Sequence, residues 1–137
     1  MRPALLALLL AGCPVPMIAR PALTGEVVDA ASGAPIAGAE VVARTYALTV
    51  PDLQRAEQIE EVRTTTDAQG QWTLPELTRT ERLLPVPEGV PGFDSALEVT
   101  AAGYRPTTQD LPIGERVPPL RLPLAPLPLE NVSSPGR

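Results

Sequence analysis

Residues 23–41 read Leu-Thr-Gly-Glu-Val-Val-Asp-Ala-Ala-Ser-Gly-Ala-Pro-Ile-Ala-Gly-Ala-Glu-Val, and this stretch decides the fold class. The alternation of residues 23–29 predicts a strand, because successive side chains of a strand point to opposite faces. The glycines and the proline of residues 30–38 predict a turn. Residues 39–45 are again rich in valine and alanine and predict a second strand. The stretch is therefore expected to form a strand–turn–strand unit.

The same signals recur along the rest of the chain. Asp67 and Gly70 bound a predicted turn, in which Asp67 caps the backbone and Gly70 supplies a positive φ. Pro123 cannot donate a hydrogen bond, so the last strand is expected at a sheet edge or paired only on its other side. Seven short strands with close turns predict an all-β sandwich of two sheets. The further strands are expected at residues 61–66, 71–74, 96–101 and 104–111 and at the alternating leucines 120, 122 and 124.

Three ordered signatures carry a family resemblance. They are residues 23–41, the segment Thr-Asp-Ala-Gln-Gly-Gln-Trp-Thr-Leu at 66–74, and Ala-Ala-Gly-Tyr at 101–104. Together they resemble a carboxypeptidase regulatory-like domain over residues 22–125. The resemblance implies a seven-stranded, transthyretin-like (prealbumin-like) β-sandwich with Trp72 and Tyr104 packed on its core. Regulatory-like domains are themselves not catalytic, so the resemblance implies no catalytic residue here.

Two segments depart from the family pattern, and the tail follows them. Residues 51–61 lengthen one connection and are expected to form a long hairpin loop, and the spacing of Leu53, Ala56 and Ile59 leaves a short helix as the alternative. Residues 75–95 hold several prolines and glycines and are expected to be an irregular, exposed loop. Residues 126–137 are expected to be a disordered tail.

The N-terminus carries the clearest targeting signal. Arg2 precedes the apolar run at residues 4–10, and Ala11-Gly12 precede Cys13, the single cysteine of the chain. This order resembles a bacterial lipobox, in which residues 1–12 are a cleaved lipoprotein signal peptide and the cysteine thiol is acylated. The alternatives are a plain secretory signal with an incidental cysteine, or a buried N-terminal strand.

The lipobox resemblance implies a location and an anchor. Acyl chains such as palmitate on Cys13 would hold the protein at a membrane, because each buried methylene contributes about 0.8 kcal/mol. The prolines of residues 13–21 predict a stiff spacer between anchor and domain. Pro14 rather than an aspartate follows the cysteine, which favours the outer membrane of a bacterial cell envelope, facing the periplasm or the cell surface.

The composition excludes several kinds of chemistry. The chain has no histidine and no lysine, which excludes Ser-His, Cys-His and Schiff-base catalysis. One cysteine allows no internal disulfide and no multi-cysteine metal site. A formal net charge of −5 repels phosphate backbones, so no nucleic-acid partner is expected. Glu57, Glu60 and Glu61 form the only carboxylate cluster considered for catalysis, and a solvated acidic face is its simpler interpretation.

These observations predict a protein without catalytic residues, metal or cofactor. We expect a non-catalytic, lipid-anchored cell-envelope protein whose β-sandwich is an interaction or scaffold module. Its expected partners are the membrane, through Cys13, and a protein of the envelope. The alternative is a carbohydrate-binding module that holds a glycan through Tyr46 and Phe93, because the other two aromatic residues are expected in the core.

Overall fold

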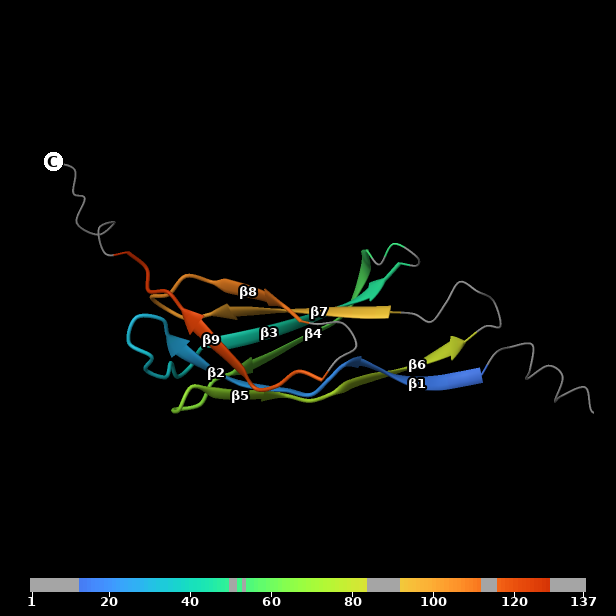
Figure 1. The fold of residues 1–137 in the computed structure, drawn as a ribbon, viewed down its shortest axis with the longest axis horizontal. Coiled ribbons are helices and arrows are strands. Elements are labelled where there is room, and N and C mark those ends of the chain that lie inside the picture. The colour runs from blue at the N-terminus through green and yellow to red at the C-terminus, as the bar shows by residue number, and fades with distance from the viewer. Residues whose placement is uncertain (1–12, 50–51, 53, 84–91, 112–115, 129–137) are drawn as a thin grey trace, which may run out of the picture.

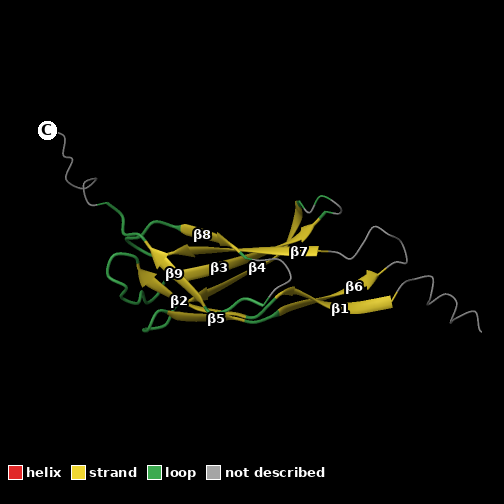
Figure 2. Ribbon diagram, in the orientation of Figure 1, coloured by secondary structure: helices red, strands yellow, loops and turns green. Residues whose placement is uncertain are grey.

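The computed structural model describes residues 13–49, 52, 54–83, 92–111 and 116–128. Its described part is all-β, as the sequence predicts, and contains strands but no helix (Figure 2). The strands are β1 (Cys13–Arg20), β2 (Leu23–Asp29), β3 (Glu40–Leu48), β4 (Arg55–Thr65), β5 (Gln71–Leu74), β6 (Leu77–Leu83), β7 (Gly92–Thr100), β8 (Thr107–Asp110) and β9 (Leu120–Leu124).

Two sheets face each other across the core. One has the order β5-β2-β9 and the other the order β4-β3-β7-β8. β9 runs parallel to β2 and lies at a sheet edge, as its prolines predict. The remaining strands, β1 and β6, form an antiparallel ribbon that continues the β2–β5 pair beyond the core (Figure 1). Seven of the nine described strands therefore match expected strands, and the ribbon adds two.

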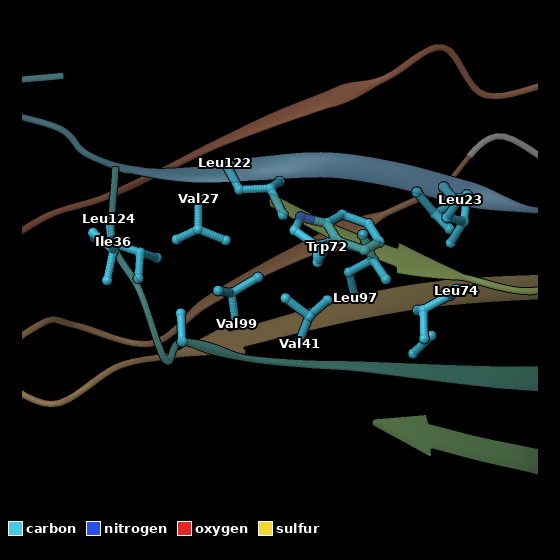
Figure 3. Close-up of a cluster of buried hydrophobic side chains, with 13 residues drawn as sticks. Leu23, Val27, Ile36, Val41, Trp72, Leu74, Leu97, Val99, Leu122 and Leu124 are labelled. Atoms are coloured by element: carbon cyan, nitrogen blue, oxygen red, sulfur yellow. The ribbon is translucent and has the colours of Figure 1, made fainter. Parts of the chain in front are cut away.

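The core fills the space between these sheets with alternate residues of each strand. Leu97 and Val99 of β7 and Val41 of β3 face Leu122 and Val27 of the opposite sheet (Figure 3). All five side chains are less than 2% exposed. Full burial of such a side chain contributes about 1.5–3 kcal/mol, so aliphatic packing supplies most of the stability. The core therefore follows from the alternation in the sequence.

Trp72 lies within this core, 3% exposed, where the family resemblance places it. Gly25 makes room for the indole, since a Cβ on this glycine would lie 2.8 Å from the ring and 2.5 Å from the Leu120 carbonyl oxygen. The close approach of three strands at this point depends on the missing side chain.

The turn before β5 forms as the sequence predicts. Asp67 Oδ1 accepts hydrogen bonds from the backbone N–H groups of Gln69 and Gln71, each at 2.9 Å. Gly70 has a φ of 73°. A short carboxylate and a left-handed glycine thus close the β4–β5 connection.

Neither the hairpin loop nor the alternative short helix expected for residues 51–61 extends past residue 54, because Arg55 onward is β4, paired along β3. The pairing shifts register twice, and the extra residues on β4 are Ala56 and Ile59. Bulged residues three apart mimic helical spacing. Residues 51 and 53 lie outside the described part.

The irregular loop predicted at residues 75–95 is also wrong where the structure describes it. Residues 77–83 form β6, and β7 begins at Gly92. β6 is threonine-rich and pairs residue by residue with β1, and tertiary pairing overrides the flanking prolines. Residues 84–91 lie outside the described part.

The proline-rich residues 13–20, expected to be a spacer, are extended but paired. Pro14 lies opposite Arg82 and Pro16 opposite Thr80. A proline fits a ladder only where its nitrogen points away from the partner strand, and residues two apart meet this condition together. The expected tail also starts later than predicted, because the Leu127 N–H donates to the Gly103 carbonyl at 2.9 Å. Residues 1–12 and 129–137 lie outside the described part.

Candidate functional site

Cys13 is the first residue of β1 and lies opposite Leu83 of β6. The predicted leader precedes it and the strands follow it. Loss of residues 1–12 would therefore leave all the described strands intact.

The structure does not bring Tyr46 and Phe93 together as a ligand platform. Tyr46 pairs with Asp94 and Phe93 pairs with Ala47, so the two rings lie on opposite faces of one sheet. The Phe93 side chain faces the interior and is 8% exposed. The Arg55 guanidinium lies 4.6 Å from the centre of the half-buried Tyr46 ring and covers one face of it.

The strand register places Glu57 opposite Ala47 and Glu60 opposite Thr45, on one face of the sheet, and Glu61 on the other face. Glu60 faces inward and pairs with the Arg20 guanidinium of β1. Glu61 faces outward and accepts from Arg63 and Arg44, which lower the pKa of its carboxyl, the Arg63 hydrogen bond most. Glu57 is exposed. Ion pairs therefore hold Glu61 on the outer face of the sheet and Glu60 on its inner face.

The outer face of the four-stranded sheet is a lattice of ion pairs. Arg44 bridges Glu61 and Glu98, and Arg55 bridges Asp94 and Asp110. Such partly exposed pairs contribute little to stability, because water screens them. Their charges are matched within the chain, so this face offers little to a charged ligand.

The opposite sheet carries a hollow of about 430 Å³ on its outer face. It lies where β5, β2 and β9 run side by side (Figure 1). Its lining is polar at the rim and apolar below, and consists of Thr24, Gly25, Glu26, Gln71, Trp72, Thr73, Pro119, Leu120 and Arg121.

The strand register explains the shape of this hollow, which we call the β2 hollow. Thr24 lies beside Thr73, and Glu26 lies between Gln71 and Arg121. Gly25, which has no side chain, lies between these two rows of outward side chains. The residues paired with it on β5 and β9 point into the core, so the floor of the hollow is formed by backbone. Two rows of outward polar side chains therefore flank a shallow backbone channel.

The side chains around the β2 hollow offer several groups that can hydrogen-bond to a ligand. Arg121 is 64% exposed, and its Nε lies 3.9 Å from Glu26 Oε1, beyond hydrogen-bond distance. The guanidinium is therefore available to a carbonyl or carboxylate of a partner. The threonine hydroxyls and the Gln71 amide add neutral donors and acceptors. Sequence reasoning missed this site because its residues look like ordinary outward strand positions until the sheet order is known.

A second polar contact fixes the end of β2 next to the first turn. Asp29 Oδ1 accepts from the backbone N–H groups of Ala31 and Ser32 at 2.7 and 3.0 Å, and Oδ2 accepts from the Tyr104 hydroxyl at 2.8 Å. These bonds, led by that of Tyr104, lower the pKa of the Asp29 carboxyl. The same bond raises the pKa of the Tyr104 hydroxyl.

This contact predicts a stability window in pH. The pKa of Asp29 is held below its ordinary value of 3.8, so the contact stabilises above about pH 4 and is lost as pH falls through the folded pKa. The pKa of Tyr104 is held above its ordinary value of 10.0, so its share is lost as pH rises through that folded pKa. In urea unfolding at pH 3, 7 and 11, Tyr104→Phe should show a smaller loss of stability than the wild type at both low and high pH. Equal pH dependence in wild type, Tyr104→Phe and the control Tyr46→Phe would contradict this.

No protein-family model and no curated protein matches the chain. Over the described ranges, no group of three or more Cys, Asp or Glu side chains could hold a metal ion. The same residues include no helix that is long and apolar enough to span a membrane.

Proposed function

We propose that this protein is a non-catalytic, lipid-anchored protein of the bacterial cell envelope, and that its β-sandwich is an interaction module. The observation that carries the proposal is the order of Arg2, apolar run, Ala11-Gly12 and Cys13 immediately before β1. β1 (Cys13–Arg20) is the first of the described strands, so cleavage before Cys13 would remove none of the described strands. Acyl chains on Cys13 then hold the module at the membrane. The outer membrane is the compartment that we propose.

The core strands support a transthyretin-like assignment as part of this proposal. Three strands, β5-β2-β9, pack on four, β4-β3-β7-β8, and the ribbon lies outside this set. Trp72 and Tyr104 contact the core, which agrees with two of the three signatures. A regulatory-like sandwich of this kind would serve as a scaffold for recognition and not as an enzyme.

The anchor is tested by metabolic labelling with a palmitate analogue in a bacterial host. The wild-type chain should be labelled and should remain with the membranes, and Cys13→Ala should be unlabelled. Pro14→Ala is the matched control, because it changes the neighbouring residue and keeps the thiol. Label on Cys13→Ala, or none on the wild type, would refute the lipid anchor.

We propose the β2 hollow as the surface that meets an envelope partner. Polar side chains there surround a concave backbone channel, and Glu26 holds the exposed Arg121 guanidinium only loosely, with 3.9 Å between Oε1 and Nε. Binding sites commonly combine a concave surface with a few convergent polar groups. No observation on the described aromatic residues favours the carbohydrate-binding alternative.

Site-specific photocrosslinking tests this surface. A benzophenone side chain at Thr73, inside the hollow, should give a discrete crosslinked product in intact envelopes. The same group at Thr108, an exposed threonine on β8, is the control and should not. Arg121→Ala should reduce the Thr73 product about tenfold, as expected for a charge-assisted hydrogen bond. Equal products at both positions would remove the hollow from the proposal.

A further inference from the structure

We propose that β6 is an interface at which two copies of this chain pair strand to strand. The β1–β6 ribbon extends beyond the core (Figure 1), and within the described residues β6 pairs only with β1. An unpaired strand edge presents N–H and C=O groups that can accept another strand. This inference does not depend on the lipid anchor or on the β2 hollow.

The proline positions show which backbone groups β6 presents. Because Pro14 and Pro16 have no N–H, they fit the ribbon only as pairs that exchange no hydrogen bonds, and their partners are Arg82 and Thr80. The N–H and C=O groups at positions 78, 80 and 82 therefore point away from β1. The same prolines remove donors from the opposite edge of the ribbon. Thus β6, and not β1, is the edge that can be extended.

The other described sheet edges are protected in ways that β6 is not. β4 carries two bulges, and β9 contains Pro123. β5 and β8 have only four residues each. β6 has seven residues without a proline or a bulge in its own sequence. Bulges, prolines and short length are among the usual means of blunting an edge.

The sequence of β6 indicates that its occupant is a second copy. Residues 77–83 read Leu-Thr-Arg-Thr-Glu-Arg-Leu. An antiparallel pair centred on Thr80 places position 79 opposite position 81 of the other copy, an arginine opposite a glutamate, twice. It also places Leu77 opposite position 83, a leucine, twice. A two-fold interface must be self-complementary, and this strand is self-complementary in charge and in hydropathy.

The alternation of outward-pointing and inward-pointing backbone groups along β6 agrees with this same register. Centring on Thr80 makes 80 its own partner and pairs 78 with 82, which are the positions whose N–H and C=O groups point outward. About six backbone hydrogen bonds then join the two copies. In a register shifted by one residue, each outward-pointing N–H and C=O pair would face a residue whose backbone groups point toward β1. The hydrogen bonds between the two copies would then be lost.

The base of the ribbon is fixed, so the edge is held ready for pairing. The buried guanidinium of Arg20 donates to Glu60 of β4 and to the carbonyl oxygen of Pro75, where β5 leads into β6. A strand held in position loses less conformational freedom when it binds. The interface is nevertheless small, so we expect a dissociation constant of about 1–100 µM.

Cysteine crosslinking of the full chain in detergent tests the register in the cysteine-free Cys13→Ala background. Thr80→Cys should form an interchain disulfide, because a hydrogen-bonded antiparallel pair has Cα atoms about 5.5 Å apart, within the disulfide range. Thr78→Cys and Arg82→Cys should not crosslink alone, since like positions are more than about 13 Å apart, but should crosslink when mixed. Disulfides from Thr78→Cys alone, or none from Thr80→Cys, overturn the proposal.

Sedimentation of the wild-type full chain tests the backbone requirement. Thr80→Pro removes an outward N–H and leaves the ribbon bonds in place, so dimer affinity should fall about tenfold or more with the fold retained. Thr80→Val keeps the N–H and should dimerise like the wild type. Arg79→Glu should weaken the dimer, and Arg79→Glu with Glu81→Arg should restore it. A wild-type chain that is monomeric at about 300 µM, or a Thr80→Pro variant that dimerises normally, overturns the proposal.

Discussion

Glu60→Ala should destabilise the protein by about 3–5 kcal/mol, because it leaves the Arg20 guanidinium buried without its carboxylate. Arg20 is 1% exposed, and Glu60 is the acidic group that it contacts in the described structure. A typical domain of this size has a total stability of about 5–15 kcal/mol, so this loss would bring the protein close to unfolding at room temperature. Urea unfolding followed by Trp72 fluorescence measures the effect.

Two variants separate the buried pair from general effects of substitution on β4. Glu57→Ala changes an exposed glutamate of the same strand and should shift stability by about 0.5 kcal/mol or less. Arg20→Met with Glu60→Ala removes both charges and should recover most of the loss, since a buried pair can be replaced by apolar groups at little cost. A loss under about 1 kcal/mol for Glu60→Ala would show that Arg20 reaches water when its partner is absent.

The surroundings of Arg20 explain why this pair is sensitive. Thr45, which lies opposite Glu60, and Ser95 are buried and hydrogen-bond to each other at 3.0 Å, and neither carries a charge that could replace that of Glu60. The Nε of Arg20 already has no hydrogen-bond partner within the described part of the chain. This end of the interior is therefore polar, and its stability depends on complete pairing.

Gly70→Ala should cost about 3 kcal/mol or more, and Gly38→Ala about 1–2 kcal/mol. The two glycines have φ values of 73° and 74°, so the conformational penalty of a side chain is the same at both. The two positions differ in the room that the structure leaves for a Cβ atom. A Cβ at Gly70 would lie 2.7 Å from the Val27 carbonyl oxygen, whereas a Cβ at Gly38 would have no atom within 4 Å. The backbone of β2 cannot move aside without loss of the core.

The difference between these two variants therefore measures the close approach of the β4–β5 turn to β2. The Val27 N–H donates to the Gly70 carbonyl at 2.8 Å, which holds the two segments together. Thermal unfolding of the wild type and both variants gives the two values in one experiment. Equal losses would mean that the turn moves away from β2 and that only the glycine conformation is required there.

Local sequence patterns predicted the strands whose residues alternate and whose ends carry turn residues. β2 and β5 have their expected bounds, whereas β3 ends at Leu48 instead of residue 45 and β7 begins at Gly92 instead of residue 96. The shared parts were predictable because inward residues such as Leu97 and outward residues such as Glu98 differ plainly in polarity. β4 was misassigned over its first half, since bulges at Ala56 and Ile59 break the alternation that identifies a strand. β6 was missed because its pairing with β1 is long-range.

The candidate site was less predictable than the fold. The hollow combines Thr24, Thr73 and Arg121, which are far apart in sequence and meet only because β5 and β9 both pair with β2. No local sequence motif predicts such a site. The position of Cys13, by contrast, is a purely local signal, and its chemistry remains a prediction that labelling tests.

The sequence by itself determined the all-β class, the turns at Gly70 and Asp29, and the aliphatic core, because each follows from neighbouring residues in a strand or turn. Only the tertiary structure decided which distant segments and side chains lie next to one another. It paired the proline-rich segment after Cys13 with β6, buried Arg20 against Glu60, and assembled the β2 hollow from three strands. Those outcomes depend on contacts between residues distant in sequence, whose energies no local pattern contains.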